Sequence, residues 1–228
     1  MITTLAVSQI GPGHLYANLP NQDAGRAGQK GRYWAVAVAD GLGSKQFSDV
    51  GAKLAVELFW AMFRHCPDMK VGREFINSLY SDWVGSLSNL DIDVDSAATT
   101  FLCSWGDSEG NFQYVQIGDG LICSTSQIYS PAIQVQYSNI TSCLNGSFSN
   151  KNWHLGQGKL LDNDALFLMT DGISEDLLEP KEFVIEVRKY VRNRSKRRIK
   201  SWLKNELKNW ATPHHTDDKT VAMIIKYD

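Results

Sequence analysis

The sequence predicts an α+β fold in which antiparallel sheets are covered by paired helices. Segments with strand composition come first, two long amphipathic segments follow, and further strand segments precede a helical region and a last strand. Because strands and helices do not alternate along the chain, a doubly wound parallel sheet is disfavoured. The 228 residues suit one domain, and we find no internal repeat or linker. We therefore expect a single domain over residues 1–228.

Seven segments predict strands, because β-branched and aromatic residues dominate them and Gly, Asp, Asn or Ser bound them. They are Thr3–Ile10, Tyr33–Ala39, Thr99–Ser104, Phe112–Ile117, Leu121–Thr125, Ala165–Thr170 and Val221–Lys226. Apolar residues repeat at three- and four-residue spacing in Ser48–His65 and Arg73–Leu87, which predicts two helices. A third helical region begins at Pro180 and runs to Trp210, with a break expected at residues 193–195.

The composition is that of an ordinary globular protein, with 43% hydrophobic and 21% charged residues. The net charge of −2 argues against a protein that is basic throughout and binds nucleic acid. It nevertheless combines a segment of +8, residues 180–211 with 11 Lys and Arg and 3 Glu, with −10 elsewhere. The basic segment is either a solvated helix face or a docking surface for an acidic partner.

Neither a membrane anchor nor a secretion signal is expected. The sequence has no run of 18 apolar residues, and its first residues lack the basic flank of a signal peptide. The four cysteines (Cys66, Cys103, Cys123 and Cys143) form no C-x-x-C pair, which argues against a zinc site and against thioredoxin-type chemistry. We expect reduced thiols and a cytoplasmic location.

Aspartates recur at the ends of the predicted strands. Asp40, Asp119 and Asp171 each follow a strand and precede a glycine, while Asp217 and Asp218 lie just before the last strand. Each Asp-Gly pair alone is a common turn signal. Together the five residues can meet at one edge, because antiparallel neighbours start and end side by side. Clustered carboxylates repel unless a proton or cation neutralises them, and oxygen ligands suit Mg²⁺ or Mn²⁺.

Six motifs in order along the chain resemble those of the type 2C metal-dependent protein phosphatases, particularly compact bacterial members. They are Asn21-Gln22-Asp23-Ala24, Ala39-Asp40-Gly41-Leu42-Gly43-Ser44, Ala98-Thr99-Thr100, Ile117-Gly118-Asp119-Gly120, Thr170-Asp171-Gly172-Ile173-Ser174-Glu175 and Asp217-Asp218-Lys219-Thr220-Val221. The resemblance implies a four-layer αββα sandwich, with helix pairs outside two antiparallel sheets. It also implies a site for two Mn²⁺ or Mg²⁺ ions, with a third, weaker site.

The resemblance also implies a role for each matching residue. Asp40 would bridge the two metals, Asp171 and Asp217 would hold the first, and the Gly41 carbonyl the second. The remaining positions are Asp23, acting through metal-bound water, Asp119, at the weaker third site, and Glu175 and Asp218, which would lie around the ligands and act through water. The implied activity is hydrolysis of phosphoserine and phosphothreonine by a hydroxide that bridges the metals. The implied partners are phosphorylated proteins and a cognate Ser/Thr kinase.

Two positions depart from the family pattern. Asn18 stands where the family usually has the arginine that holds the substrate phosphate, and Leu42 stands where some members have a general-acid histidine. His14 is a candidate catalytic residue, as the nearest side chain that could contact the phosphate. The proton donor is His14, a metal-bound water or the His214/His215 pair.

Two other functions remain open at this stage. The missing arginine and the basic segment also fit a weakly active or inactive phosphatase-like module that binds or senses a partner. A metal-dependent enzyme for another phosphoester, such as a nucleotide, is the third hypothesis. Residues 126–163, rich in Ser, Asn and Gly, are expected to form a variable flap over the site.

Overall fold

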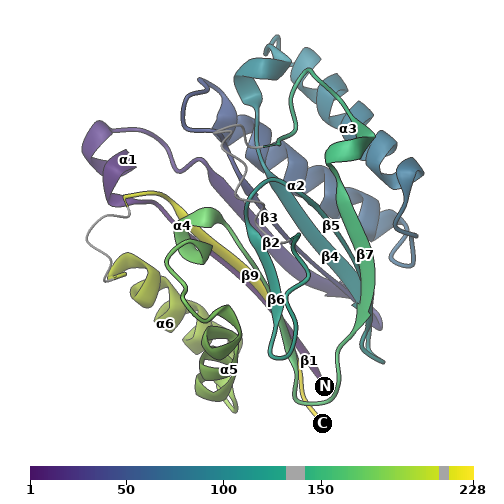
Figure 1. Cartoon of the computed structure of the whole chain (residues 1–228), viewed down its shortest axis with the longest axis vertical. Coiled ribbons are helices and arrows are strands. Elements are labelled where there is room, and N and C mark those ends of the chain that lie inside the picture. Colours follow the sequence, from purple (N-terminus) through teal and green to yellow (C-terminus); the bar gives the residue numbers. More distant parts are fainter. Residues whose placement is uncertain (132–141, 211–215) are drawn as a thin grey trace.

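Two antiparallel sheets packed face to face form the centre of the molecule, and helices cover both outer faces (Figure 1). The computed structural model describes residues 1–131, 142–210 and 216–228. The first sheet has the order β1 (Ile2–Gln9), β9 (Lys219–Lys226), β8 (Ala165–Met169) and β6 (Leu121–Ser124). The second has the order β2 (Asp23–Lys30), β3 (Tyr33–Asp40), β4 (Phe101–Asp107), β5 (Asn111–Ile117) and β7 (His154–Lys159).

Each sheet is covered by one helix pair. Helices α2 (Ser48–His65) and α3 (Arg73–Ser88) pack on the second sheet, while α5 (Pro180–Val191) and α6 (Lys196–Lys208) pack on the first. The short elements are α1 (Pro12–Ala17), α4 (Asp171–Ser174) and two 3₁₀ turns, Val94–Ala97 and Asn150–Asn152. The predicted four-layer αββα sandwich is thus confirmed. None of the described helices is long and apolar enough to cross a membrane.

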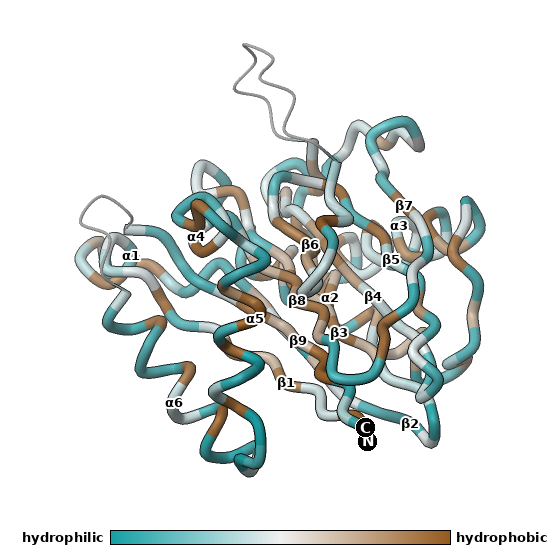
Figure 2. Tube along the Cα trace, turned by 60° about the horizontal axis from the view of Figure 1, so that its bottom comes forward, coloured by the Kyte–Doolittle hydropathy of each residue, from teal (hydrophilic) through white to brown (hydrophobic). Residues whose placement is uncertain are grey.

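Strand β3 shows how the sequence builds these layers. Its residues point alternately to the two faces of the sheet. The alanines Ala35, Ala37 and Ala39 join the core under α2 and α3, whereas Trp34, Val36 and Val38 fill the space between the sheets. Apolar residues accordingly concentrate along the central strands, while α6 is mostly hydrophilic (Figure 2). A strand buried on both faces explains the unbroken apolar run before Asp40.

The predicted elements are all present, with ends shifted by a few residues. The predicted strand from Thr99 begins at Phe101, and the predicted break in the third helical region lies between Val191 and Lys196. There Ser195 caps α6 by accepting a hydrogen bond from the Arg198 backbone. Strands β2 and β7 and helices α1 and α4 were not predicted. Part of the expected flap forms β7, and its residues 132–141 lie outside the described residues.

Two glycines in the helices over the second sheet should respond to alanine with opposite signs. A Cβ at Gly51 in α2 would lie 1.8 Å from the Ala97 carbonyl oxygen, whereas Gly85 in α3 faces open space. We expect Gly51→Ala to lower the free energy of unfolding by about 2–3 kcal/mol through overpacking. Gly85→Ala should raise it by about 0.5–1 kcal/mol through helix propensity. Urea denaturation measures both, and a Gly51→Ala protein as stable as the wild type would contradict the packing.

Candidate active site

Aspartates from both sheets meet at one end of the sandwich. Asp40 closes β3 opposite Asp23, the first residue of β2, because the two strands pair in that register. Asp119 lies in the turn between β5 and β6, Asp171 begins α4 directly after β8, and Asp217 precedes β9. A cavity of about 310 Å³ opens at this end. Among the residues that line it are Asp40, Gly41, Asp119, Asp171, Asp217 and His14.

Two threonines of the third motif hold the backbone of Asp40. The Asp40 carbonyl accepts hydrogen bonds from the Thr100 backbone at 2.7 Å and from Thr99 Oγ1 at 2.9 Å. The Asp40 N–H donates to Thr100 Oγ1 at 3.0 Å. All three donor–acceptor pairs act on backbone atoms, so the carboxylate of Asp40 stays available to the cavity. This explains the physical role of the small-Thr-Thr motif.

A buried glutamine that sequence reasoning missed fixes the Asp119 turn. Gln116 is 2% exposed, and its Nε2 donates to the carbonyls of Gly118 and Gly120 at 3.0 and 2.7 Å. Its Oε1 accepts from Ser130 Oγ at 2.7 Å. Both ends of the side chain are therefore used, and the turn that carries Asp119 is clamped from beneath. An amide in the middle of an otherwise apolar strand was the available signal.

Asp23 lies beneath the cavity and is only partly satisfied. Its Oδ2 accepts a hydrogen bond from Thr170 Oγ1 at 2.9 Å, while its Oδ1 is buried without a partner among the described residues. Burial raises the pKa of Asp23 to about 8, against the hydrogen bonds of Thr220 and Thr170 and with the charges of Asp218 and Asp171. The fold thus holds a carboxyl group where its ionised form is disfavoured.

Asp40 and Asp171 share the same strained environment. Burial, followed by the charges of Asp23 and Asp171, raises the pKa of Asp40 well above its usual value. Burial also raises the pKa of Asp171, with contributions from Asp119 and Asp217, although its hydrogen bond with Asp40 opposes this. Without a cation, a proton between the two carboxylates relieves their repulsion.

The oxygen donors at this end fit a hard divalent cation. In the described part of the chain, no group of three or more His, Cys, Asp and Glu side chains forms a ready metal site. The donor chemistry nevertheless fits, because the carboxylates are crowded, the buried oxygens Asp23 Oδ1 and Gln22 Oε1 lack partners, and oxygen is the preferred ligand of Mg²⁺ and Mn²⁺. Asp40, Asp171, Asp217 and the Gly41 carbonyl are the groups that would hold it.

Three other residues named from the sequence lie in different surroundings. Glu175 is exposed after α4 and contributes charge to Asp171. Asp218 is buried beside the cavity, where its oxygens accept hydrogen bonds from Gly11, Gln22 and His14. The His214/His215 pair lies outside the described residues.

The sequence matches the family model of protein phosphatase 2C over residues 10–210. This chain belongs to that family. A search of curated proteins found no match. Among solved structures, the Mycobacterium tuberculosis serine/threonine phosphatase PstP/Ppp is similar, with a TM-score of 0.64 and 16% identity over 100% of this chain and 99% of that chain.

Two further phosphatase structures show the same fold. RsbX in complex with magnesium has a TM-score of 0.63 and 16% identity, covering 98% of this chain and 94% of that one. PppA, a regulatory component of the type VI secretion system of Pseudomonas aeruginosa, has a TM-score of 0.66 and 14% identity, covering 99% and 98%. At these identities the likeness concerns the fold.

Removing one buried charge should stabilise the metal-free protein. Asp40→Asn keeps the shape of the side chain and removes the charge that burial and neighbouring aspartates disfavour. We expect its melting temperature in EDTA to exceed that of the wild type by about 4–8 °C, equivalent to about 1–2 kcal/mol. The control Asp82→Asn changes an exposed aspartate of α3 and should shift it little. An unchanged or lower melting temperature for Asp40→Asn would contradict the proposed electrostatic strain.

Proposed function

We propose that this protein is a Mn²⁺- or Mg²⁺-dependent phosphatase that hydrolyses phosphoserine and phosphothreonine in proteins. The observation that carries the proposal is the cavity at the end of the sandwich, where Asp40, Asp119, Asp171 and Asp217 converge in a chain of the protein phosphatase 2C family. The cavity lies at the surface, so a phosphorylated side chain presented by another protein can reach the carboxylates.

The residues of the cavity divide the tasks of phosphomonoester hydrolysis. Asp40, Asp171, Asp217 and the Gly41 carbonyl would hold two cations, and Asp119 a third. When bound, such cations activate water and offset charge on the phosphoryl oxygens. No cysteine lines the described cavity, and the buried thiols of Cys103 and Cys123 have raised pKa values, chiefly through burial. A thiol nucleophile is therefore not supported, and direct attack of water is the simpler route.

The phosphatase assay separates this proposal from the two alternatives. We expect purified protein with Mn²⁺ to hydrolyse a phosphothreonine peptide and EDTA to abolish the activity. Asp40→Asn and Asp171→Asn should each lower kcat/KM by at least about 100-fold, because each removes a charge that would hold the cations. The control is Asp82→Asn on α3, which should keep wild-type activity. Stable partner capture without Mn²⁺-dependent hydrolysis would favour a binding module instead, and exclusive hydrolysis of nucleotides another phosphoesterase.

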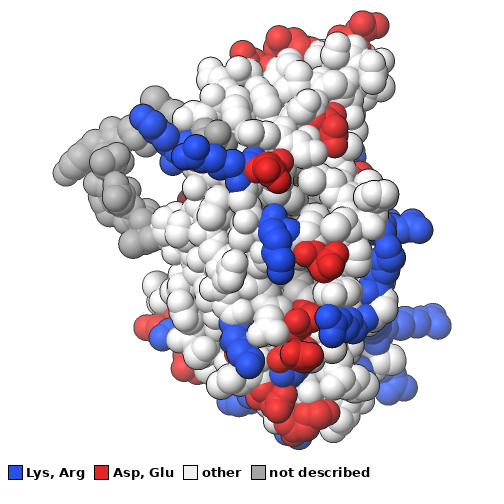
Figure 3. All heavy atoms as spheres, turned by 90° about the vertical axis from the view of Figure 1, so that its right-hand side faces the viewer, with Lys and Arg blue, Asp and Glu red and all other residues white. Residues whose placement is uncertain are grey.

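We further propose that one side of α6 docks an acidic segment of the phosphoprotein substrate. The α6 stripe consists of Arg197, Lys200, Lys204 and Lys208, all exposed and spaced so that they share one side of the helix. In the described part of the chain these four cations form no ion pair. By contrast, acidic and basic side chains are interspersed on the face that includes α3 and β7 (Figure 3).

The position of α6 relative to the site supports this role. Trp210, just after α6, donates a hydrogen bond from Nε1 to Asp176 Oδ2 at 2.8 Å, which ties this end of the helix to the segment after α4. Helix α4 carries Asp171. Four unpaired cations beside a phosphate-cleaving site attract an acidic segment over distances of about a Debye length. A cognate kinase with an acidic surface is a further partner of the same chemistry.

Charge reversal on the α6 stripe should weaken substrate binding without affecting chemistry. We expect Lys200→Glu/Lys204→Glu to raise KM roughly 10-fold for a phosphoprotein with an acidic segment and to leave kcat unchanged, because rim charges act on encounter. A short neutral phosphopeptide should show no change. The control is Lys70→Glu/Arg73→Glu at the start of α3, where the charges are also exposed. An equal rise in KM for both double variants would refute a docking role specific to α6.

A further inference from the structure

A buried carboxylate next to the metal-binding motif serves a histidine. Asp218 is 1% exposed. One oxygen accepts from the Gly11 backbone N–H at 2.7 Å, and the other accepts from the Gln22 N–H at 2.6 Å and faces His14 Nδ1 at 2.8 Å. The two backbone donors favour the ionised carboxylate. Both oxygens of Asp218 are thus occupied by protein groups, and the residue acts through His14.

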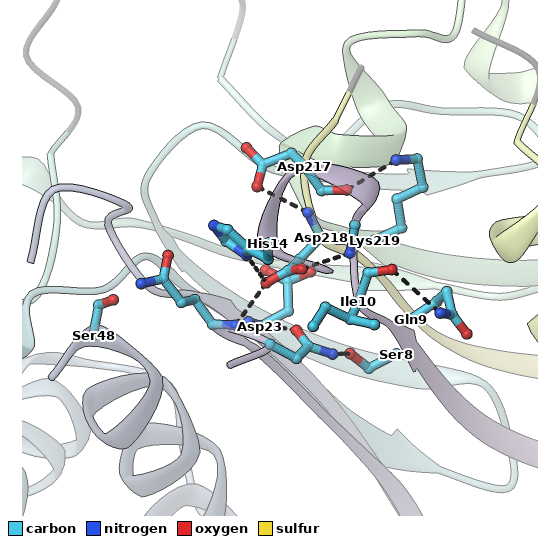
Figure 4. Close-up of polar contacts among 12 residues, drawn as sticks. Ser8, Gln9, Ile10, His14, Asp23, Ser48, Asp217, Asp218 and Lys219 are labelled. Carbon is cyan, nitrogen blue, oxygen red and sulfur yellow. Dashed lines mark hydrogen bonds and ion pairs between the residues drawn. The ribbon is translucent and has the colours of Figure 1, made fainter. Parts of the chain in front are cut away.

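This contact fixes the orientation of His14. A carboxylate at Nδ1 takes the proton of that nitrogen and leaves Nε2 as the nitrogen that exchanges a proton. The ring turns its second nitrogen away from Asp218 (Figure 4). His14 lines the same cavity as Asp40 and Asp171, with its side chain 16% exposed. A histidine held in this way can deliver a proton to a group bound in the cavity.

The glycines around His14 bring its helix against the site. A Cβ at Gly11 would lie 2.3 Å from the backbone of Asp217, and one at Gly13 would lie 3.0 Å from the Thr216 side chain. The Gly13 N–H donates to the Thr216 carbonyl at 2.9 Å. Helix α1 is therefore pinned to the segment that carries Asp217 and Asp218. The Gly-Pro-Gly-His sequence is explained by this close approach.

His14 is the described cavity residue best suited to donate a proton. Leu42 lines the same cavity and offers only carbon, at the position where some relatives have a histidine. The other titratable side chains there are Asp40, Asp119, Asp171 and Asp217. These carboxylates would be committed to cations and cannot also supply the proton.

We infer that His14, positioned by Asp218, is the general acid that protonates the departing serine or threonine oxygen. The inference rests on the proposed phosphatase function. A water oxygen forms a bond to phosphorus as the bond from phosphorus to the substrate oxygen breaks. That oxygen takes the proton of His14 Nε2 and leaves as the alcohol, while the proton lost by the attacking water restores the imidazole through solvent. The products are the hydroxyl side chain and inorganic phosphate.

The experiment compares leaving groups of different basicity in the purified full-length protein with Mn²⁺. His14→Asn retains a nitrogen donor near the position of Nδ1 for Asp218 and removes Nε2. We expect kcat for a phosphoserine peptide, whose alkoxide leaves poorly, to fall by about 100-fold or more. For p-nitrophenyl phosphate, whose leaving group needs no proton, kcat should fall less than about threefold. Asp218→Asn should show the same selectivity at about 10-fold for the peptide.

Controls separate this inference from the function on which it rests. Exposed His65 of α2 lies outside the cavity, and His65→Asn should leave both rates unchanged. The Mn²⁺-induced rise in melting temperature should persist in both site variants, which shows that they fold and bind metal. His14→Gln provides a second variant if His14→Asn is unfolded. Equal loss on both substrates, a rise in KM alone or no loss overturns the inference, whereas an inactive wild type overturns the proposed function and the inference with it.

Discussion

The repulsion among carboxylates buried at one end of the sandwich is the constraint on which the rest of this site depends. A folded chain reduces such repulsion by moving the groups apart, taking up protons or binding cations. Here the first route is blocked, because hydrogen bonds to Thr99 and Thr100 hold the Asp40 backbone and Gln116 clamps the Asp119 turn. The raised pKa values of Asp23 and Asp40 show that the second route operates when no cation is present.

The same hydrogen bonds also join the two sheets. Thr170 ends the β8 side of the first sheet, and its Oγ1 donates to Asp23 of the second sheet while accepting from the Thr220 backbone. Nearby, Ser8 Oγ accepts from Asn21 and from Thr220 Oγ1. The polar residues around the site thus connect the layers where the apolar core ends. A substitution among them would disturb both sheet packing and carboxylate positions.

The sequence predicted those parts of the fold that depend on local patterns. Ser48–His65 keeps one apolar face and forms a helix with those bounds, and the apolar run before Asp40 forms a strand. Strand β2, Asp-Ala-Gly-Arg-Ala-Gly-Gln-Lys, has neither β-branched residues nor regular alternation. Its conformation comes from pairing with β3 in a register that places Asp23 beside Asp40. Tertiary pairing overrides weak local preference there.

The candidate site divides along the same line. Aspartates at strand ends were visible in the sequence, because antiparallel topology brings strand ends together. The partners of those aspartates were not visible, since Asp218 and His14 are 204 residues apart and Asp23 and Thr170 are 147 apart. The functional identity of a carboxylate therefore depends on which donors surround it. Asp217 keeps its side chain at the cavity, whereas Asp218, one residue later, turns into the protein and meets backbone N–H groups and an imidazole.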